Sequence, residues 1–161
     1  MNLDDIEFEE RETGLVAEFD LHNLLTPVEV RISSNSPLIR ERQERAVLAE
    51  FLAAWPSIEA RLRKAAFSYY LATEAAVEDC GPHIASEDRV WAFAKLHSIQ
   101  VPELLSKDRF VQVLGSCSWE EEHGLEVCVR NGQEIIYVGP FNGKSHRESY
   151  AGKPWNHAPD A

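Results

Sequence analysis

Seven consecutive residues in the second half of the chain carry the side chains best suited to chemistry. Trp119–Leu125 reads Trp-Glu-Glu-Glu-His-Gly-Leu and lies between two expected strands. Glu122 and His123 are a candidate acid–base pair, because histidine titrates near neutral pH and a carboxylate can orient its ring. Neighbouring side chains on an extended chain point to opposite faces, so this pair converges only if a turn or bulge intervenes. The simpler interpretation is a connection in which Trp119 fills the core and Gly124 adopts a positive φ angle.

Cysteine and histidine spacing raises zinc binding as a second possibility. Cys80 and His83 form a C-x-x-H pair, and Cys117 and His123 lie in a separate segment. Four such ligands can make a tetrahedral site, but neither pair has the usual C-x-x-C form and no H-E-x-x-H motif occurs. Cys117 on a strand is more simply a small buried apolar residue. The chain also lacks the G-x-S-x-G elbow of serine hydrolases, so we expect no metal, no cofactor and, as the first hypothesis, no catalysis.

The charge distribution favours a protein partner over a nucleic acid. The 161 residues carry a formal charge of −11, and residues 1–30 hold nine acids against the single base Arg11. Such a surface repels phosphates and attracts a basic protein, although acidic surfaces also simply keep proteins in solution. The candidate contact residues are acids of two patches, one near the N-terminus and one in the Trp119–Leu125 segment: Glu7, Glu9, Glu10, Glu12, Glu120 and Glu121.

Composition bounds the class of protein and its compartment. With 44% apolar and 9% aromatic residues, the chain is suited to one globular domain and is not disordered throughout. No stretch of about 18 apolar residues occurs, so no membrane span is expected. Three widely spaced cysteines argue against a disulfide framework, and residues 1–7 lack the basic and apolar regions of a signal peptide. We therefore expect a cytoplasmic location.

Apolar periodicity predicts a single α+β domain over residues 1–141. Spacings of three and four from Leu38 to about Ala76 predict two helices, or one helix kinked at Pro56, and a short helix is expected from Ser86 to Leu96. Residues 142–161 are polar and contain Gly and Pro, which predicts a loosely ordered C-terminal tail. We expect an antiparallel sheet of about six or seven strands with a helical pair packed on one face. Period-two alternation places these strands near 6–8, 15–21, 28–32, 98–104, 110–118, 125–130 and 134–141.

Three segments together resemble a bacterial domain family of unknown function with a W-D-x-E-H-G-L motif. They are residues 43–52 (QERAVLAEFL), residues 58–70 (IEARLRKAAFSYY) and Trp119–Leu125, in that order. The resemblance covers most of residues 1–141 and departs from the motif at Glu120, where the family has Asp. Members of such families often lie in gene neighbourhoods of polymorphic toxins and their immunity proteins. The resemblance therefore implies a bacterial origin and an immunity-like role, with no chemistry to carry over.

Two functions from different classes follow, and a third is left open. The first is a non-catalytic, cytoplasmic protein-binding module of the immunity type, whose acidic surface occupies a basic effector or toxin. The alternative is a small hydrolase or metal-dependent enzyme centred on Glu122 and His123, favoured if a cleft holds both side chains within hydrogen-bond reach and Cys80 or His83 converges on them. The third is a structural domain that self-associates through Leu38–Ala76, and the oligomeric state stays open.

Overall fold

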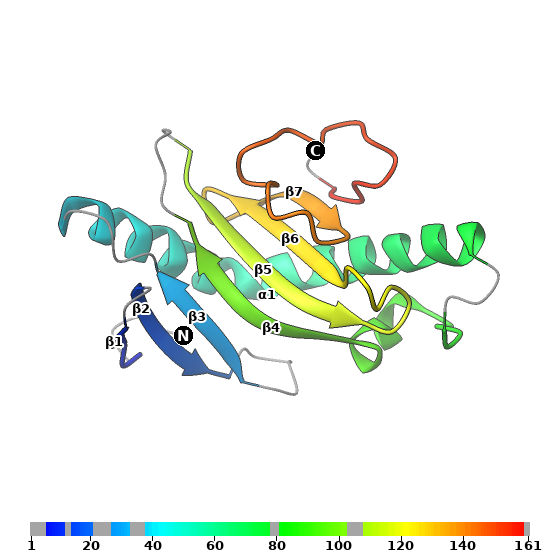
Figure 1. The fold of residues 1–161 in the computed structure, drawn as a ribbon, viewed down its shortest axis with the longest axis horizontal. Coiled ribbons are helices and arrows are strands. Elements are labelled where there is room, and N and C mark those ends of the chain that lie inside the picture. The colour runs from blue at the N-terminus through cyan, green and yellow to red at the C-terminus, as the bar shows by residue number, and fades with distance from the viewer. Residues whose placement is uncertain are drawn as a thin grey trace.

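The computed structural model describes residues 6–11, 14–20, 27–32, 38–77, 81–102 and 108–159. Within these ranges the chain forms one seven-stranded sheet, one long α-helix and one short 3-10 helix (Figure 1). The α+β class expected from the sequence is confirmed. The strands follow one another across the sheet in chain order: β1 (Glu9–Arg11), β2 (Gly14–Phe19), β3 (Val28–Ile32), β4 (Ala94–Val101), β5 (Phe110–Cys117), β6 (Leu125–Arg130) and β7 (Glu134–Gly139).

One strand pairing differs from the antiparallel sheet that the sequence predicted. β3 and β4 run parallel, with Val30 opposite Ile99, whereas every other neighbouring pair is antiparallel. A parallel pair needs a crossover connection. Here the chain leaves β3, forms α1 (Leu38–Ala76) and the 3-10 helix η2 (Glu87–Ala92), and returns to the sheet as β4. This crossover places α1 over one face of the sheet.

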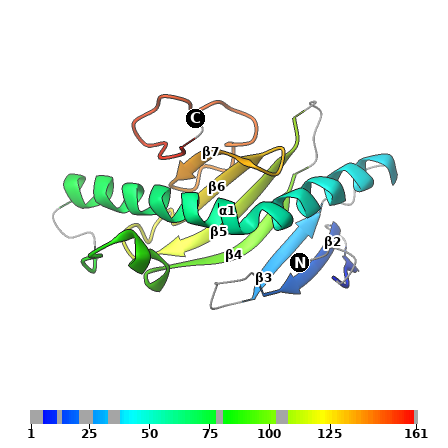
Figure 2. The same cartoon turned by 180° about the vertical axis from the view of Figure 1, so that it is seen from behind.

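The predicted helical pair is one continuous helix, α1, of 39 residues, which is the second of the two alternatives that the sequence left open. Pro56 lies inside α1 and is exposed, so its ring stays outside the core. The helix continues because buried side chains recur on both sides of the proline: Trp55 and Ile58 are 3% and 0% exposed. An interior proline costs about 3 kcal/mol, and several buried apolar side chains at about 1.5–3 kcal/mol each outweigh it. Figure 2 shows α1 running across the back of the sheet.

The length of α1 does not make it a membrane span. Within the described residues, no helix combines the length and the apolar composition needed to cross a bilayer. The other helix, expected from Ser86 to Leu96, is shorter than predicted, because η2 ends at Ala92 and β4 begins at Ala94. Buried positions alternate from Ala94 onward, which is the period of a strand.

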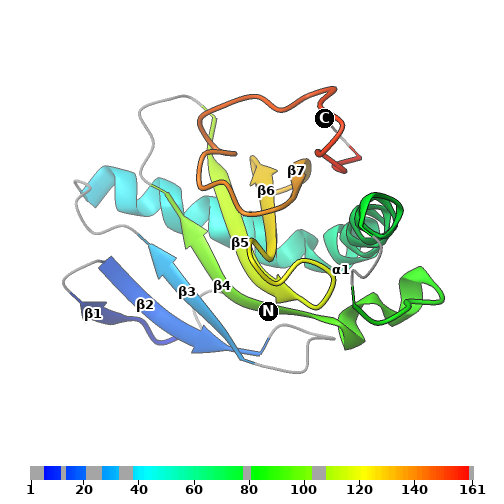
Figure 3. The ribbon, with the colours of Figure 1, turned by 45° about the vertical axis from the view of Figure 1, so that its right-hand side comes forward.

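The segment after β7, residues 140–159, lies beside β7, where the sequence predicted a loosely ordered tail (Figure 3). The backbone N–H of Val138 donates to Oδ1 of Asn156 at 3.1 Å, and the backbone N–H of His157 donates to the carbonyl oxygen of Val138 at 2.9 Å. These bonds use polar groups that an edge strand would otherwise leave open for pairing with another chain. We call residues 140–159 the C-terminal segment.

A carboxylate that no sequence pattern singled out holds the start of the C-terminal segment. Glu126 on β6 is 0% exposed. Its Oε1 accepts hydrogen bonds from Nε2 of Gln112 at 3.0 Å and from the hydroxyl of Ser145. Its Oε2 accepts from the backbone N–H groups of Asn142 and Gly143, at 2.7 and 2.9 Å. Four donors thus compensate for the loss of water around a buried charge.

Candidate functional site

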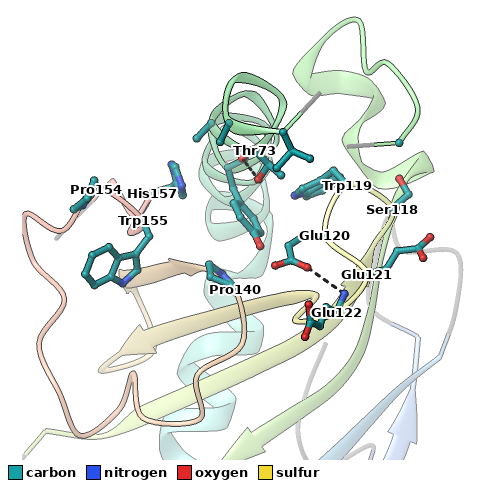
Figure 4. A pocket seen from close by; sticks show the side chains of 15 residues that line it. Thr73, Ser118, Trp119, Glu120, Glu121, Glu122, Pro140, Pro154, Trp155 and His157 are labelled. Carbon is teal, nitrogen blue, oxygen red and sulfur yellow. Dashed lines mark hydrogen bonds between the residues drawn. The ribbon is translucent and has the colours of Figure 1, made fainter. Parts of the chain in front are cut away.

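A cleft of about 850 Å³ opens at the C-terminal end of α1 (Figure 4). This volume lies in the range of about 300–1,000 Å³ that is common for ligand pockets. Four parts of the chain form its walls: the end of α1 with the residue after it, Gly81, the β5–β6 turn, and the C-terminal segment. Their main contributions are Tyr69, Ala76 and Val77, then Trp119–Glu122, then Trp155 and His157.

The β5–β6 turn is organised by the carboxylate of Glu120. Oε1 of Glu120 accepts hydrogen bonds from the backbone N–H groups of Glu122 and His123, at 3.1 and 3.3 Å. Oε2 lies 2.9 Å from Nδ1 of His123. The carbonyl oxygen of Glu120 also accepts from the backbone N–H of Gly124 at 2.9 Å. Glu120 therefore closes the turn as Asp does in similar turns, and its longer side chain still reaches both N–H groups.

These hydrogen bonds favour the ionised form of Glu120. Burial on its own would raise the pKa of this carboxyl. The hydrogen bonds from the His123 ring and from the backbone N–H groups of His123 and Glu122 outweigh burial, so the pKa lies below its usual value. The turn therefore keeps a negative charge beside the cleft throughout the neutral range.

Replacing Glu120 with glutamine is expected to lower the free energy of unfolding by about 1 kcal/mol near pH 6. A carboxyl with a lowered pKa in the folded state stabilises the fold above its ordinary pKa and loses this effect as the pH falls through the lowered value. The difference between the two chains should therefore shrink below about pH 4. Urea denaturation near pH 6 and below about pH 4 measures the difference in free energy of unfolding, and Glu121→Gln is the neighbouring control. An equal difference at both pH values would contradict an ionised, hydrogen-bonded Glu120.

Trp119 fixes the turn against α1. Its side chain is 3% exposed and meets the rings of Tyr69 and Tyr70 edge to face, with centroid distances of 5.9 and 6.0 Å. The hydroxyl of Tyr69 donates to the carbonyl oxygen of Gly124 at 3.3 Å. Trp119 is therefore a core residue, as the simpler interpretation of the sequence expected, and it also lines the cleft.

The structure does not pair Glu122 with His123. The ring of His123 is bonded to Glu120, and Glu122 lines the cleft whereas His123 is not part of its lining. In Figure 4, Glu120 lies on the side of the turn toward Pro140, and Glu121 extends to the opposite side. The turn thus presents carboxylates to the cleft, and among the described residues the His123 ring is hydrogen-bonded to Glu120 rather than to Glu122.

The residues considered for zinc do not gather in the described part of the chain. His83 Nδ1 lies near Glu74 and Tyr70, at 3.3 and 3.4 Å. Burial raises the pKa of Cys117 to about 12, so its thiol stays protonated at neutral pH. Cys80 lies outside the described residues. Among the described residues, no three His, Cys, Asp or Glu side chains are placed to share a metal ion.

The N-terminal acids form a surface separate from the cleft. Glu7, Glu9 and Glu10 are exposed, and Glu9 pairs with Arg11 at 3.1 Å, whereas Glu12 lies outside the described residues. Figures 1 and 2 place β1 and the β5–β6 turn toward opposite ends of the molecule. The described residues of the two predicted acidic patches therefore form distinct surfaces, and Glu120 and Glu121 of the second patch line the cleft.

Sequence reasoning missed the wall formed by the C-terminal segment. The ring of His157 stacks on Tyr69 with a centroid distance of 5.5 Å, and its Nδ1 lies 3.3 Å from the hydroxyl of Ser68. Burial lowers the pKa of His157 below its usual value, which favours the neutral ring. Trp155 is 46% exposed beside it. No local pattern marks these residues, because they meet α1 only through the fold.

Comparison with protein families identifies the chain. A family model matches residues 3–145, and its description is Domain of unknown function (DUF6985). The protein belongs to this family. The DUF6985 match takes in the sheet, α1 and the whole β5–β6 turn, whereas Trp155 and His157 lie beyond it. No curated protein and no solved structure matches the chain.

The match confirms the expected membership of a domain family of unknown function. It assigns the DUF6985 chain no activity, substrate or partner.

Proposed function

We propose that this protein is a non-catalytic, protein-binding module of the immunity type, which occupies and neutralises a basic effector protein in the bacterial cytoplasm. The observation that supports the proposal is the composition of the cleft. Its turn contributes three glutamates, Glu120, Glu121 and Glu122, and its other walls contribute mainly apolar and aromatic side chains.

Exposed apolar side chains contribute to the walls of this cleft. Among the described residues the large apolar side chains with high exposure are Leu71, Val77, Phe141 and Trp155. Val77 and Trp155 line the cleft, and Phe141 follows Pro140, which also lines it. Exposed apolar residues that gather beside charged ones are typical of protein interaction sites. A basic partner supplies the complementary charge.

The N-terminal acids have a different role in this proposal. Glu7, Glu9 and Glu10 are solvated, and they do not line the cleft beside the β5–β6 turn. Charges of this kind speed the approach of an oppositely charged protein without contributing much to the final contact. Reversing Glu9, Glu10 and Glu12 should therefore slow association at low salt.

The proposal is tested by retention of lysate proteins on the immobilised chain. A basic protein bound at low salt should be released at high salt, because screening weakens charge attraction. Glu121→Lys with Glu122→Lys should abolish its retention, whereas Glu9→Lys with Glu10→Lys should weaken retention only as far as association slows. The double variants carry the same change in net charge, so they form a matched pair. Equal loss in both variants, or retention that is insensitive to the cleft variant, would contradict docking at the cleft.

A further inference from the structure

We infer that the cleft receives a lysine or arginine side chain together with the main-chain carbonyl of the same residue, presented by an exposed segment of the partner protein. This inference deepens the proposed function and rests on it. Three features of the walls support it: carboxylates without a cationic partner, an apolar surface that suits the methylene groups of a long side chain, and a buried N–H group without an acceptor.

The carboxylates of the β5–β6 turn favour a ligand with a positively charged side chain. Among the residues that line the cleft in the described part of the chain there is no lysine or arginine to neutralise Glu121 and Glu122. The carboxylate of Glu120 is already engaged by His123. Glu122 donates its backbone N–H to Glu120, but its own carboxylate has no partner among the described residues. The turn therefore offers negative charge that a ligand can use.

The apolar wall suits the stem of a long cationic side chain. Val77 and Trp155 are 51% and 46% exposed, and Ala76 and Pro154 lie in the same lining. Lysine and arginine bury their methylene groups on such surfaces while the charged end reaches a polar group. The ring of Trp155 already has an ammonium group nearby, since Nζ of Lys153 lies 5.9 Å from its centroid.

The third feature is the indole N–H of Trp119. Nε1 is buried and has no hydrogen-bond partner among the described residues. In Figure 4 the indole extends from the β5–β6 turn toward the interior of the cleft, below Thr73. A buried donor without an acceptor is unfavourable, and a carbonyl oxygen at this wall would remove the penalty. Because the N–H is closed to solvent, the carbonyl has to displace the side chains that cover it.

The experiment adds small probes to the 161-residue chain and monitors binding through the indole N–H signals in the NMR spectrum. N-acetyl-lysine N-methylamide and its arginine analogue should bind and move the Trp119 signal downfield. N-acetyl-norleucine N-methylamide lacks the charge and should bind roughly three- to tenfold more weakly. n-Butylamine lacks the carbonyl and should leave the Trp119 signal in place. Trp119→Phe assigns the signal, and the comparison of probes needs no variant to fold.

A matched pair of variants tests which carboxylate of the cleft binds the cation of the probe. Glu122→Gln should reduce binding of the lysine probe to the level of the norleucine probe, and Glu121→Gln should reduce it less. Equal binding of the lysine and norleucine probes would overturn the cation site, and an unmoved Trp119 signal at saturation would overturn the carbonyl contact. If the probes fail while the lysine variants of Glu121 and Glu122 still release a retained protein, this inference falls and the proposed function stands. If the probes bind but those variants release nothing, the proposed function falls.

Discussion

Replacement of Glu126 with glutamine is expected to lower the free energy of unfolding by about 2–4 kcal/mol. The carboxylate is 0% exposed and accepts from Gln112, Ser145 and the backbone N–H groups of Asn142 and Gly143. Glutamine replaces one acceptor oxygen with an NH₂ group. That group then faces donors, so at least one N–H or hydroxyl loses its partner while it stays buried.

Urea denaturation followed by tryptophan fluorescence measures this loss. Glu134→Gln is the matched control, because Glu134 pairs with Arg130 at the surface, where its side chain is 50% exposed. Exposed ion pairs contribute about 0–1 kcal/mol, so the control should change the unfolding midpoint little. Similar midpoints for the two variants would show that the Glu126 network does not hold the C-terminal segment.

Replacement of Gly124 with alanine is expected to lower the free energy of unfolding by about 2–4 kcal/mol, for two separate reasons. Gly124 has a φ angle of +64°, which is unfavourable for a residue with a Cβ atom. A Cβ atom at this position would also lie 2.5 Å from the carbonyl oxygen of Gly115 on β5. Backbone atoms of a strand cannot move away as the end of a flexible side chain can. The turn must therefore shift, and the hydrogen bonds around Glu120 shift with it.

Gly152→Ala separates the two reasons. Gly152 has a similar φ angle of +70°, but a Cβ atom there would meet nothing within 4 Å. Alanine at this position should lower the free energy of unfolding by only about 1–2 kcal/mol, the cost of the positive φ angle alone. If both variants lose the same stability in urea denaturation, the close approach between Gly124 and Gly115 is not a determinant of the fold.

Local patterns were enough to predict much of the fold. Val28, Val30 and Ile32 alternate with polar residues, and all three are buried on β3. Asn131-Gly132 predicted the hairpin between β6 and β7, and both residues have the positive φ angles that such a turn requires. These features depend on residues that are adjacent in the chain.

The cleft and the buried carboxylate could not be predicted in this way. The alternation in Leu125–Arg130 is typical of a strand with one solvent-facing side, which places Glu126 in water. The structure buries it because the C-terminal segment covers that side. His157 likewise gains its contact with Tyr69 through a long-range arrangement. No periodicity within one element reports such contacts.

The cleft joins residues that lie inside the family match to residues that lie beyond it. The wall formed by α1 and the β5–β6 turn lies inside the region shared with the family, and several of its residues also build the core: Tyr69 and Trp119 are 4% and 3% exposed. The opposite wall, at Trp155 and His157, lies beyond residue 145, where the family match ends. Trp155 is 46% exposed, so a substitution there changes the lining of the cleft without removing a buried core side chain. The cleft therefore combines one wall that is built into the core of the family domain with another that follows the matched region in the chain.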